Sequence, residues 1–522
     1  MKTRTFLVSA AILMGTRLFA GDFVTNSNHS AQWARMLSRN AVIDADATYY
    51  NPAALNFLPK NGLFVSLNNQ VISQERTIKS TYPALNDGSY TGKIFVPAFP
   101  SIYAGYKTEK FTISGAFFIA GGGGGATYDK GLPAFEYGLT DLVPGLAPQG
   151  VNGYRADIHF EGTSVFYGYQ LNFSYKINDQ LSIAVGGRLV YASESYKGYL
   201  RNIEVYNYYK NPNNWTRADA IMQGAATSFT NAAKGSQALI DNGAGAMTFA
   251  QVEGAGYISA TNRAELEGAL TALGYPAATP ISSANAIFTG AAAQYGAKAM
   301  LLGDQEADTK RTGMGFAPVI AINFKPNDQL NIGLKYTHQA NIELEYDTKK
   351  DFITGFNTDG TPITKFPNGQ KNRLDMPSTL SLGATYKPIE KLLVSVSCDY
   401  FFDKQANWSG RQDSLDGNGI EAGIGFEYSL NEKLALSTGY MYSKPGIAAG
   451  CQSDMGFELN AHSVAFGARY KLNEMIEINA GIEYSAYEDF DKNFTRNAIA
   501  YKETYGKHTL IGAIGLNLYF GK

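Results

Sequence analysis

Apolar and polar residues alternate in short runs along most of this chain. Leu171, Phe173 and Tyr175 occupy alternate positions, and the residues between them are polar. Because successive side chains of a β-strand point to opposite faces, this period of two predicts a strand with one apolar face. After a short polar turn the alternation resumes at Leu181. The two runs and their turn therefore predict a β-hairpin.

The same hairpin pattern recurs along the chain, each time with an aromatic residue just before the turn. These aromatic residues are Tyr106, Tyr175, Phe324, Tyr386, Tyr428 and Tyr470. A ring of aromatic side chains at one level is typical of the boundary between a membrane and water. A soluble β-sandwich could show the same alternation, with its apolar face turned inward, but it does not explain this ring. The pattern favours a transmembrane barrel over a secreted soluble β-protein.

Turns divide the alternating runs into fourteen predicted strands. Their approximate bounds are 62–78, 93–107, 109–120, 157–176, 180–198, 311–325, 329–346, 373–387, 390–403, 417–430, 432–444, 457–471, 474–487 and 504–520. Six junctions are tight turns and the alternate seven are longer, which is the pattern of short periplasmic turns and long extracellular loops. We therefore expect an all-β fold, a fourteen-stranded antiparallel transmembrane β-barrel in the bacterial outer membrane.

Composition agrees with a membrane location. Charged residues make up 17% of the 522 residues, below the roughly 25% that is usual for soluble domains. No apolar run of about 18 residues follows the N-terminus, so helical membrane spans are excluded. The first residues, MKTRTFLVSAAILMGTRLFAG, combine basic residues with an apolar stretch and predict an export signal over residues 1–20.

Charge, cysteine and histidine content narrow the chemistry further. The formal net charge of −2 gives no support for a nucleic-acid partner. Cys398 and Cys451 are the only cysteines, so a disulfide framework is not expected. Histidines with the outward-facing parity are His159, His338, His462 and His508, and His29 precedes the barrel. We therefore expect no catalytic residues, no metal site, no cofactor and no enzymatic activity.

The segment 21–61 precedes the first predicted strand and is too short and irregular for another hairpin. Side chains fill a barrel of about eight strands, and barrels of about sixteen leave an aqueous channel. A barrel of intermediate size needs something inside it, or it leaks. We therefore expect residues 21–61 to form a plug, called the hatch below, inside a barrel that covers residues 62–522.

Within the hatch, the stretch SRNAVIDADATYYNPAAL, residues 38–55, resembles the hatch signature of the FadL family of outer-membrane transporters for long-chain fatty acids and aromatic hydrocarbons. The matching residues are Arg39, Asn40, Ala41, Asp44, Asp46, Asn51, Pro52 and Ala53. The resemblance implies a fourteen-stranded barrel that is closed by an N-terminal hatch. It also implies that ligand leaves sideways, where the third strand kinks inward.

A run of glycines follows the third predicted strand. It consists of Gly121, Gly122, Gly123, Gly124 and Gly125. Glycine in a strand permits bulges, bends and close approach of the backbone. We therefore take this run as the candidate for a lateral opening, with a flexible loop root at the outer end of the strand as the alternative.

A long extracellular loop, residues 199–310, separates the fifth and sixth predicted strands. Asn262 is expected to cap a helix that ends near Gly274, and a second helix is expected over residues 283–302. The resemblance implies that this loop and the next extracellular loop, residues 347–372, form an apolar groove that first captures ligand. Local packing is the alternative explanation for the apolar side of these helices.

Charged residues with the lumen-facing parity carry mixed signs. They are Arg188, Lys335, Asp399, Glu427, Arg469, Glu477 and Glu483. Salt bridges that hold the hatch or line water are the expected role for most of them. A carboxylate on a ligand would favour a positive partner, so Arg188 and Lys335 are the candidates to bind one, on parity alone.

The expected function is passive uptake of hydrophobic small molecules, most of all long-chain fatty acids, through a hatch-gated barrel that acts as a monomer. Its expected partners are the hydrophobic ligand, outer-membrane lipid and lipopolysaccharide, and the barrel-assembly machinery. A general porin for polar solutes is one alternative, and it predicts an open lumen. A surface adhesin whose large loop binds another surface is the other.

Overall fold

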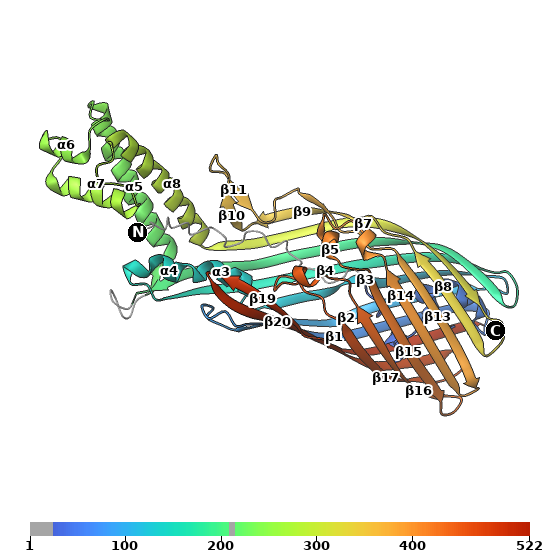
Figure 1. Ribbon diagram of the computed structural model, residues 1–522. Coiled ribbons are helices and arrows are strands. Elements are labelled where there is room, and N and C mark those ends of the chain that lie inside the picture. Colours follow the sequence, from blue (N-terminus) through green and yellow to red (C-terminus); the bar gives the residue numbers. More distant parts are fainter. Residues whose placement is uncertain (1–24, 208–214, 522) are drawn as a thin grey trace.

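Antiparallel strands form a closed barrel in the computed structural model, which describes residues 25–207 and 215–521 (Figure 1). β1 (Gly62–Ser80) pairs with β2 (Ser89–Lys107) on one side and with β20 (Ile499–Gly521) on the other, and the second pairing closes the wall. Within the described residues, fourteen strands follow one another round this wall. The others are β3 (Phe111–Tyr128), β4 (Gly153–Lys176), β5 (Leu181–Tyr206), β7 (Gln305–Phe324), β8 (Leu330–Thr337), β13 (Thr379–Ile389), β14 (Leu392–Phe401), β15 (Gly419–Ser429), β16 (Leu434–Lys444), β17 (Ala461–Lys471) and β18 (Ile476–Tyr487).

The predicted number and order of strands are confirmed, but several predicted bounds are not. β5 runs on to Tyr206 and β7 begins already at Gln305, so both reach further outward than the alternation indicated. The seventh predicted strand, 329–346, is divided into β8 and β9 (Glu343–Lys350). Pairing between β7 and β8 stops beside Pro318, because proline has no N–H to donate to the neighbouring strand.

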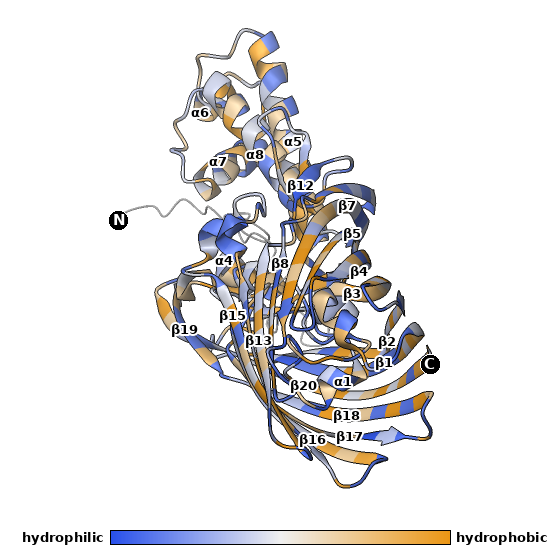
Figure 2. Ribbon diagram, turned by 90° about the vertical axis from the view of Figure 1, so that its right-hand side faces the viewer, coloured by the Kyte–Doolittle hydropathy of each residue, from blue (hydrophilic) through white to orange (hydrophobic). Residues whose placement is uncertain are grey.

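The apolar face of the barrel points outward. On β4, Leu171 and Tyr175 are 65% and 42% exposed, whereas Asn172 and Ser174 are 2% and 0% exposed. A soluble protein would bury the apolar set instead, so the wall presents its apolar side chains to lipid. Figure 2 shows the alternation of hydrophobic and hydrophilic residues along the strands.

The wall is much taller on one side. β14 and β16 have 10 and 11 residues, whereas β4 and β5 have 24 and 26. At about 3.3 Å per residue, β5 is roughly 85 Å long, far longer than a hydrocarbon core of about 30 Å. The long strands therefore continue well beyond the membrane on the side of the long loops. Figure 1 shows β4 and β5 extending past the ends of the short strands.

A helical module joins β5 to β7 and projects from the outer end of the barrel (Figure 1). Its elements in the described part of the loop are β6 (Trp215–Arg217), α5 (Ala218–Asp241), α6 (Phe249–Gly254), α7 (Ala260–Ala272) and α8 (Ile281–Leu302). Phe249, Leu270 and Phe288 are fully buried in an apolar cluster that belongs to the module alone. The module therefore has a core of its own.

Two helices of the module were predicted, and α5 was missed, although its apolar residues recur with a helical period. The prediction that Asn262 caps α7 is wrong. The cap is Ser259, whose Oγ accepts a hydrogen bond from the Asn262 N–H at 3.2 Å, so Asn262 lies in the first turn. The predicted end near Gly274 is confirmed, and α8 begins at Ile281 rather than at Ser283.

Shorter elements cover the outer mouth of the barrel. They are α3 (Pro133–Thr140), α4 (Leu142–Leu146), η2 (Ala147–Gln149), β10 (Ile353–Phe356), β11 (Pro362–Thr364), β12 (Lys371–Arg373), η3 (Asp403–Gln405), η4 (Arg411–Ser414), η5 (Ala449–Cys451) and β19 (Phe490–Arg496). Leu139, Phe457 and Tyr505 are buried in one apolar cluster there, called the outer cluster below. None of the described helices has the length and the apolar character needed to cross a membrane.

Candidate functional site

The segment before β1 lies inside the barrel. Residues 29–56 are almost entirely buried and contain α1 (Ala31–Ala34), α2 (Ala47–Tyr50) and the 3-10 helix η1 (Pro52–Phe57). α1 contacts β1, β17, β18 and β20, whereas η1 contacts β3, β4, β5 and β7. The segment therefore reaches from one side of the wall to the other, in the position expected of a hatch. The predicted export signal, residues 1–20, lies outside the described residues.

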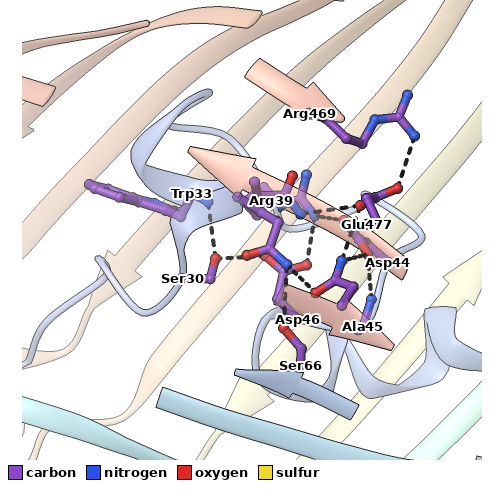
Figure 3. A network of polar contacts seen from close by, with 12 residues as sticks. Ser30, Trp33, Arg39, Asp44, Ala45, Asp46, Ser66, Arg469 and Glu477 are labelled. Carbon is purple, nitrogen blue, oxygen red and sulfur yellow. Dashed lines mark hydrogen bonds and ion pairs between the residues drawn. The ribbon is translucent and has the colours of Figure 1, made fainter. Parts of the chain in front are cut away.

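A buried arginine organises the hatch itself. Arg39 is 2% exposed, and its Nη2 lies 2.8 Å from a carboxylate oxygen of Asp44 and 2.6 Å from one of Asp46. Ser30 also donates a hydrogen bond to Asp46, at 2.8 Å. Figure 3 shows Arg39, Asp44 and Asp46 pointing toward one another. Burial of an unpaired arginine would be costly, so the two carboxylates of the signature are what allow this residue to lie in the centre of the hatch.

A second group of charges ties the hatch to the wall. Arg35 of the hatch forms an ion pair with Glu427 of β15 and donates to Asn479 of β18 at 3.0 Å. Glu427 in turn lies 2.8 Å from Arg469 of β17, which also pairs with Glu477 of β18 at 3.4 Å. Of the lumen-facing charges that parity identified, Glu427 therefore binds the hatch directly, and Arg469 and Glu477 extend its network along the wall. Asp399 also binds the hatch, because it accepts a hydrogen bond from Asn40 at 3.0 Å.

The Asn51-Pro52-Ala53 motif is hydrogen-bonded to two wall strands and packs against a third. Asn51 Oδ1 accepts a hydrogen bond from the Ala53 N–H at 3.2 Å, and Asn51 Nδ2 donates to a carbonyl of β7, that of Ile322, at 3.2 Å. The Pro52 carbonyl accepts from Ser174 of β4 at 2.7 Å. Ala53 is fully buried against an alanine of β5 and another of β7. The motif thus fixes the end of the hatch in the wall, and its role in transport stays a prediction.

Several glycines of the wall, Gly333 and Gly383 among them, let the hatch lie directly against it. A Cβ on Gly333 would lie 2.3 Å from the Asn40 carbonyl oxygen, and one on Gly383 would lie 2.8 Å from the Ala41 nitrogen. Both distances are shorter than any real Cβ contact, so only glycine admits the hatch backbone at these positions. Sequence reasoning missed them because a glycine in an alternating strand gives no sign of what approaches it.

Arg188 and Lys335 lie against the hatch. Lys335 Nζ donates to the Tyr49 carbonyl at 2.9 Å and lies 4.3 Å from the centre of the Tyr49 ring. The Arg188 guanidinium lies 4.9 Å from the same ring and 5.0 Å from the ring of Phe118, and its Nε donates to Gln170. Both side chains are buried under the hatch, and neither lines either of the two cavities described below. Their assignment to a ligand carboxylate stays a prediction.

The wall is interrupted between β2 and β3. Ladder pairing runs from Lys107 opposite Thr112 to Ile102 opposite Phe117, and it resumes only at Lys93 opposite Thr127. The unpaired part of β2 contains two prolines, at positions 97 and 100, which cannot donate a hydrogen bond across the gap.

The unpaired part of β3 contains the glycine run. β3 continues to Tyr128, so residues 121–125 lie within the strand rather than beyond its end at residue 120, where the sequence prediction placed it. The register against β4 shifts on both sides of Gly121. Gly122 and Gly124 have φ angles of +86° and +79°, which side chains other than glycine rarely adopt. The run is therefore a kink in the wall, and passage of ligand at this kink stays a prediction.

The hatch supplies bonding partners to the kinked strand. The Asn26 N–H donates to the Ala120 carbonyl at 3.0 Å, and Asn26 Nδ2 donates to the Gly122 carbonyl at 2.9 Å. Phe118 is fully buried, and its ring centre lies 4.9 Å from that of His29 and 4.8 Å from that of Tyr49. The hatch, rather than β2, thus supplies hydrogen-bond donors to the Ala120 and Gly122 carbonyls at the interruption.

A cavity of about 210 Å³ lies between the hatch and the wall, and it is called the lumenal cavity below. Its apolar lining includes Trp33 of α1, Phe99 of β2 and Ile511 of β20, and it borders Gly122 at the kink. Glu421 is part of its polar lining. This residue was overlooked, although it has the same parity as Glu427 and continued alternation along β15 would have found it.

A second cavity, of about 300 Å³, lies on the other side of the hatch. It is lined by hatch residues such as Arg39 and by residues of the short turns, among them Lys391 and Glu474. The hatch therefore separates a cavity toward the outer end from one toward the short turns.

Comparison with known proteins was made at the level of sequence and of fold. The family model of the Outer membrane protein transport protein (OMPP1/FadL/TodX) matches residues 254–520, just over half of the chain. No curated protein matches the sequence.

Solved structures share the fold at low sequence identity. The toluene transporter TodX of Pseudomonas putida has a TM-score of 0.54 and 14% identity, over 96% of this chain and 99% of that one. A FadL homologue of Pseudomonas aeruginosa has a TM-score of 0.57 and 12% identity, over 96% of this chain and 100% of that one. At these identities the likeness shows the fold, and the family match adds the class. The chain therefore belongs to the OMPP1/FadL/TodX family, outer-membrane transport proteins for hydrophobic compounds that are built on a fourteen-stranded β-barrel.

Proposed function

We propose that this protein takes up hydrophobic small molecules by passive diffusion, through the lumenal cavity and out sideways between β2 and β3. The observation that carries this proposal is that the lumenal cavity borders Gly122, where the pairing of β2 with β3 is interrupted. A compound in the cavity is thus separated from the lipid by a part of the wall that has no ladder hydrogen bonds to break.

The surroundings of the interruption suit an apolar compound. Ile72, Phe99, Ile119 and Ile511 form one buried apolar cluster there, and partly buried residues such as Tyr167 pack against it. Each Å² of apolar surface exposed to water costs about 25 cal/mol. A hydrophobic compound that passes from this cluster into the bilayer is not exposed to water on the way. A polar solute on the same path would lose its hydration. The path therefore favours hydrophobic compounds over the solutes of a general porin.

We place the first capture of ligand at the outer cluster. Leu302 of α8 and Phe352 and Phe366 of the loop 347–372 are buried in it together, so the large loop and the following loop meet at this point. This meeting of the two loops supports the capture surface that the sequence resemblance implies. The isolated core of the helical module, by contrast, gives no support to an adhesin whose module binds another surface.

Long-chain fatty acids are the first candidate ligands, because residues 38–55 resemble the hatch signature of the FadL family. Aromatic hydrocarbons are the second candidate. Outer-membrane lipid and lipopolysaccharide are the proposed neighbours of the apolar outer face, and the barrel-assembly machinery is the proposed route of insertion. A monomer suffices for this path, because the hatch, the cavity and the interruption all belong to one chain.

The proposal is tested by replacing Gly122 with alanine. The new Cβ would lie 2.2 Å from the Ser164 carbonyl oxygen, at a φ of +86°, so the kink must change its shape. If about 1 kcal/mol of this strain raises the barrier to passage, uptake slows about fivefold. Uptake of labelled dodecanoate and of labelled toluene is measured per assembled barrel, in cells that lack another transporter of this kind.

The matched control is Gly512→Ala on β20, where an added Cβ meets no atom within 4 Å. The control should transport like the natural protein. Equal uptake by Gly122→Ala and Gly512→Ala would overturn the lateral path. Passage of a small sugar at the rate of toluene would favour the general porin instead.

A further inference from the structure

Two glutamates line the polar side of the lumenal cavity. They are Glu421 of β15 and Glu483 of β18. Ser443 donates to Oε1 of Glu421 at 3.1 Å, and Ser485 donates to Oε1 of Glu483 at 2.8 Å. The second oxygen of each carboxyl group, Oε2, is buried and has no hydrogen-bond partner among the described residues. Glu483 is 4% exposed and belongs to the lining, so its unpartnered oxygen is kept away from bulk water.

No ion pair compensates these two glutamates within residues 25–207 and 215–521. Lys507, a cation in the lining, lies 3.6 Å from Glu458. Lys444, the other one, is exposed at the outer end of β16. Asp403 also belongs to the lining and adds a further carboxyl group. The lumenal cavity therefore has an excess of acidic groups, whereas Arg188 and Lys335 are covered by the hatch.

Apolar residues line the same cavity. Ile511 of β20 is paired with Glu483 on the neighbouring strand, Ile72 of β1 is paired with Ile511, and Trp33, Phe99 and Gly122 also belong to the lining. A molecule in the cavity thus meets apolar side chains and carboxyl groups side by side. Unsatisfied buried acceptors are costly, and a donor on the ligand removes that cost.

We propose that the lumenal cavity selects hydrophobic ligands whose polar end is uncharged and donates a hydrogen bond, such as a hydroxyl or a protonated carboxyl group. The inference rests on the proposed function and adds the head group of its ligand. A carboxylate anion would bring a further negative charge beside Glu421 and Glu483, and like charges at short range oppose each other strongly in a buried site. A fatty acid accordingly enters this cavity in its protonated form.

Binding of three matched probes tests the proposal. Dodecan-1-ol donates a hydrogen bond, methyl dodecanoate does not, and dodecanoate at pH 8 is an anion. The full chain is studied in lipid nanodiscs, with Trp215→Phe and Trp408→Phe, so that the change in Trp33 emission as a probe displaces water reports on the cavity. Because a hydrogen bond to a charged acceptor is strong, dodecan-1-ol should bind at least about tenfold more tightly than either other probe.

The Glu421→Gln/Glu483→Gln protein keeps the shape of both side chains and removes their charge. In this variant dodecanoate should bind more tightly. The ratio of the affinity for dodecan-1-ol to the affinity for dodecanoate should therefore fall toward one. The matched control is Glu432→Gln, an exposed glutamate in a short turn far from the cavity, which should leave the ratio unchanged. Heat-modifiable migration on gels confirms that each variant is assembled.

The outcomes separate the two proposals. Binding of dodecanoate as tight as that of dodecan-1-ol in the natural cavity would overturn the head-group selection and leave uptake of hydrophobic compounds standing. An unchanged ratio in the double variant would overturn it as well. Absence of any change in Trp33 emission with all three probes would overturn the lumenal cavity as a ligand site, and with it the proposed function.

Discussion

Asn51 is the residue through which the end of the hatch is fixed to β7. Its side-chain oxygen accepts a hydrogen bond from the N–H of Ala53, a fully buried residue, and its side-chain nitrogen donates one to the carbonyl of Ile322. Asn51→Leu leaves the buried Ala53 N–H without its partner, which costs about 1–3 kcal/mol, and removes the hydrogen bond to the Ile322 carbonyl, which keeps its place in the ladders of β7. We expect the hatch to loosen while the barrel still assembles, because the ladder hydrogen bonds of the wall do not involve this side chain. Uptake per assembled barrel should therefore fall.

The control for this prediction is Asn493→Leu, which alters an exposed asparagine of β19 that is remote from the hatch. It should transport normally. If Asn51→Leu barrels also transport normally, the motif serves only the architecture. If instead little assembled protein is found in the outer membrane, the motif is needed to start the barrel.

Among elements, the hatch is held by side-chain contacts, whereas the wall is held by its backbone ladders. Deleting residues 21–61 removes Arg35 and Arg39, but Glu427 keeps Arg469 as a partner 2.8 Å away. The ladders between neighbouring strands remain. We therefore expect a barrel that assembles and shows large, stable conductance in planar bilayers, since a lumen of this width conducts when it is empty.

The intact protein should conduct poorly in the same bilayers, because the hatch separates the two cavities. A deletion protein that conducts no better than the intact one would show that something other than residues 21–61 closes the lumen. Heat-modifiable migration again distinguishes a closed barrel from a misfolded one.

The whole molecule consists of a barrel and a helical module with separate cores. Residues such as Phe249 and Phe288 are buried within the module, whereas Met222 at the base of α5 and Leu302 at the end of α8 belong to the outer cluster. Replacing residues 224–296 with a short Gly-Ser linker keeps that base. We expect normal assembly and normal uptake per barrel from this truncated protein, since the proposed capture surface is retained.

Uptake is measured over a range of ligand concentrations, because loss of a capture surface raises the half-saturating concentration before it lowers maximal uptake. A raised half-saturating concentration in assembled, truncated barrels would move the capture surface from the outer cluster into the module.

Alternation along the sequence determined the wall of this protein. The face on which Leu171 and Tyr175 lie depends only on local spacing, so it could be predicted without knowing which strands pair. The number of strands, their outward apolar face and the position of the hatch motif around Asn51 all follow from such local patterns. The lumen-facing charges Glu427, Arg469 and Glu477 could likewise be found by parity.

Only the tertiary structure decided how these parts form a path. Parity assigned Arg188 and Lys335 to the lumen, but the packing of Tyr49 against them depends on a segment far away in the chain. The glycine run predicted a kink, yet the loss of pairing with β2 and the bonds from Asn26 arise from the register of strands and hatch. Glu421 and Glu483 meet in one cavity because the wall is closed and curved, and local spacing carries no information about closure.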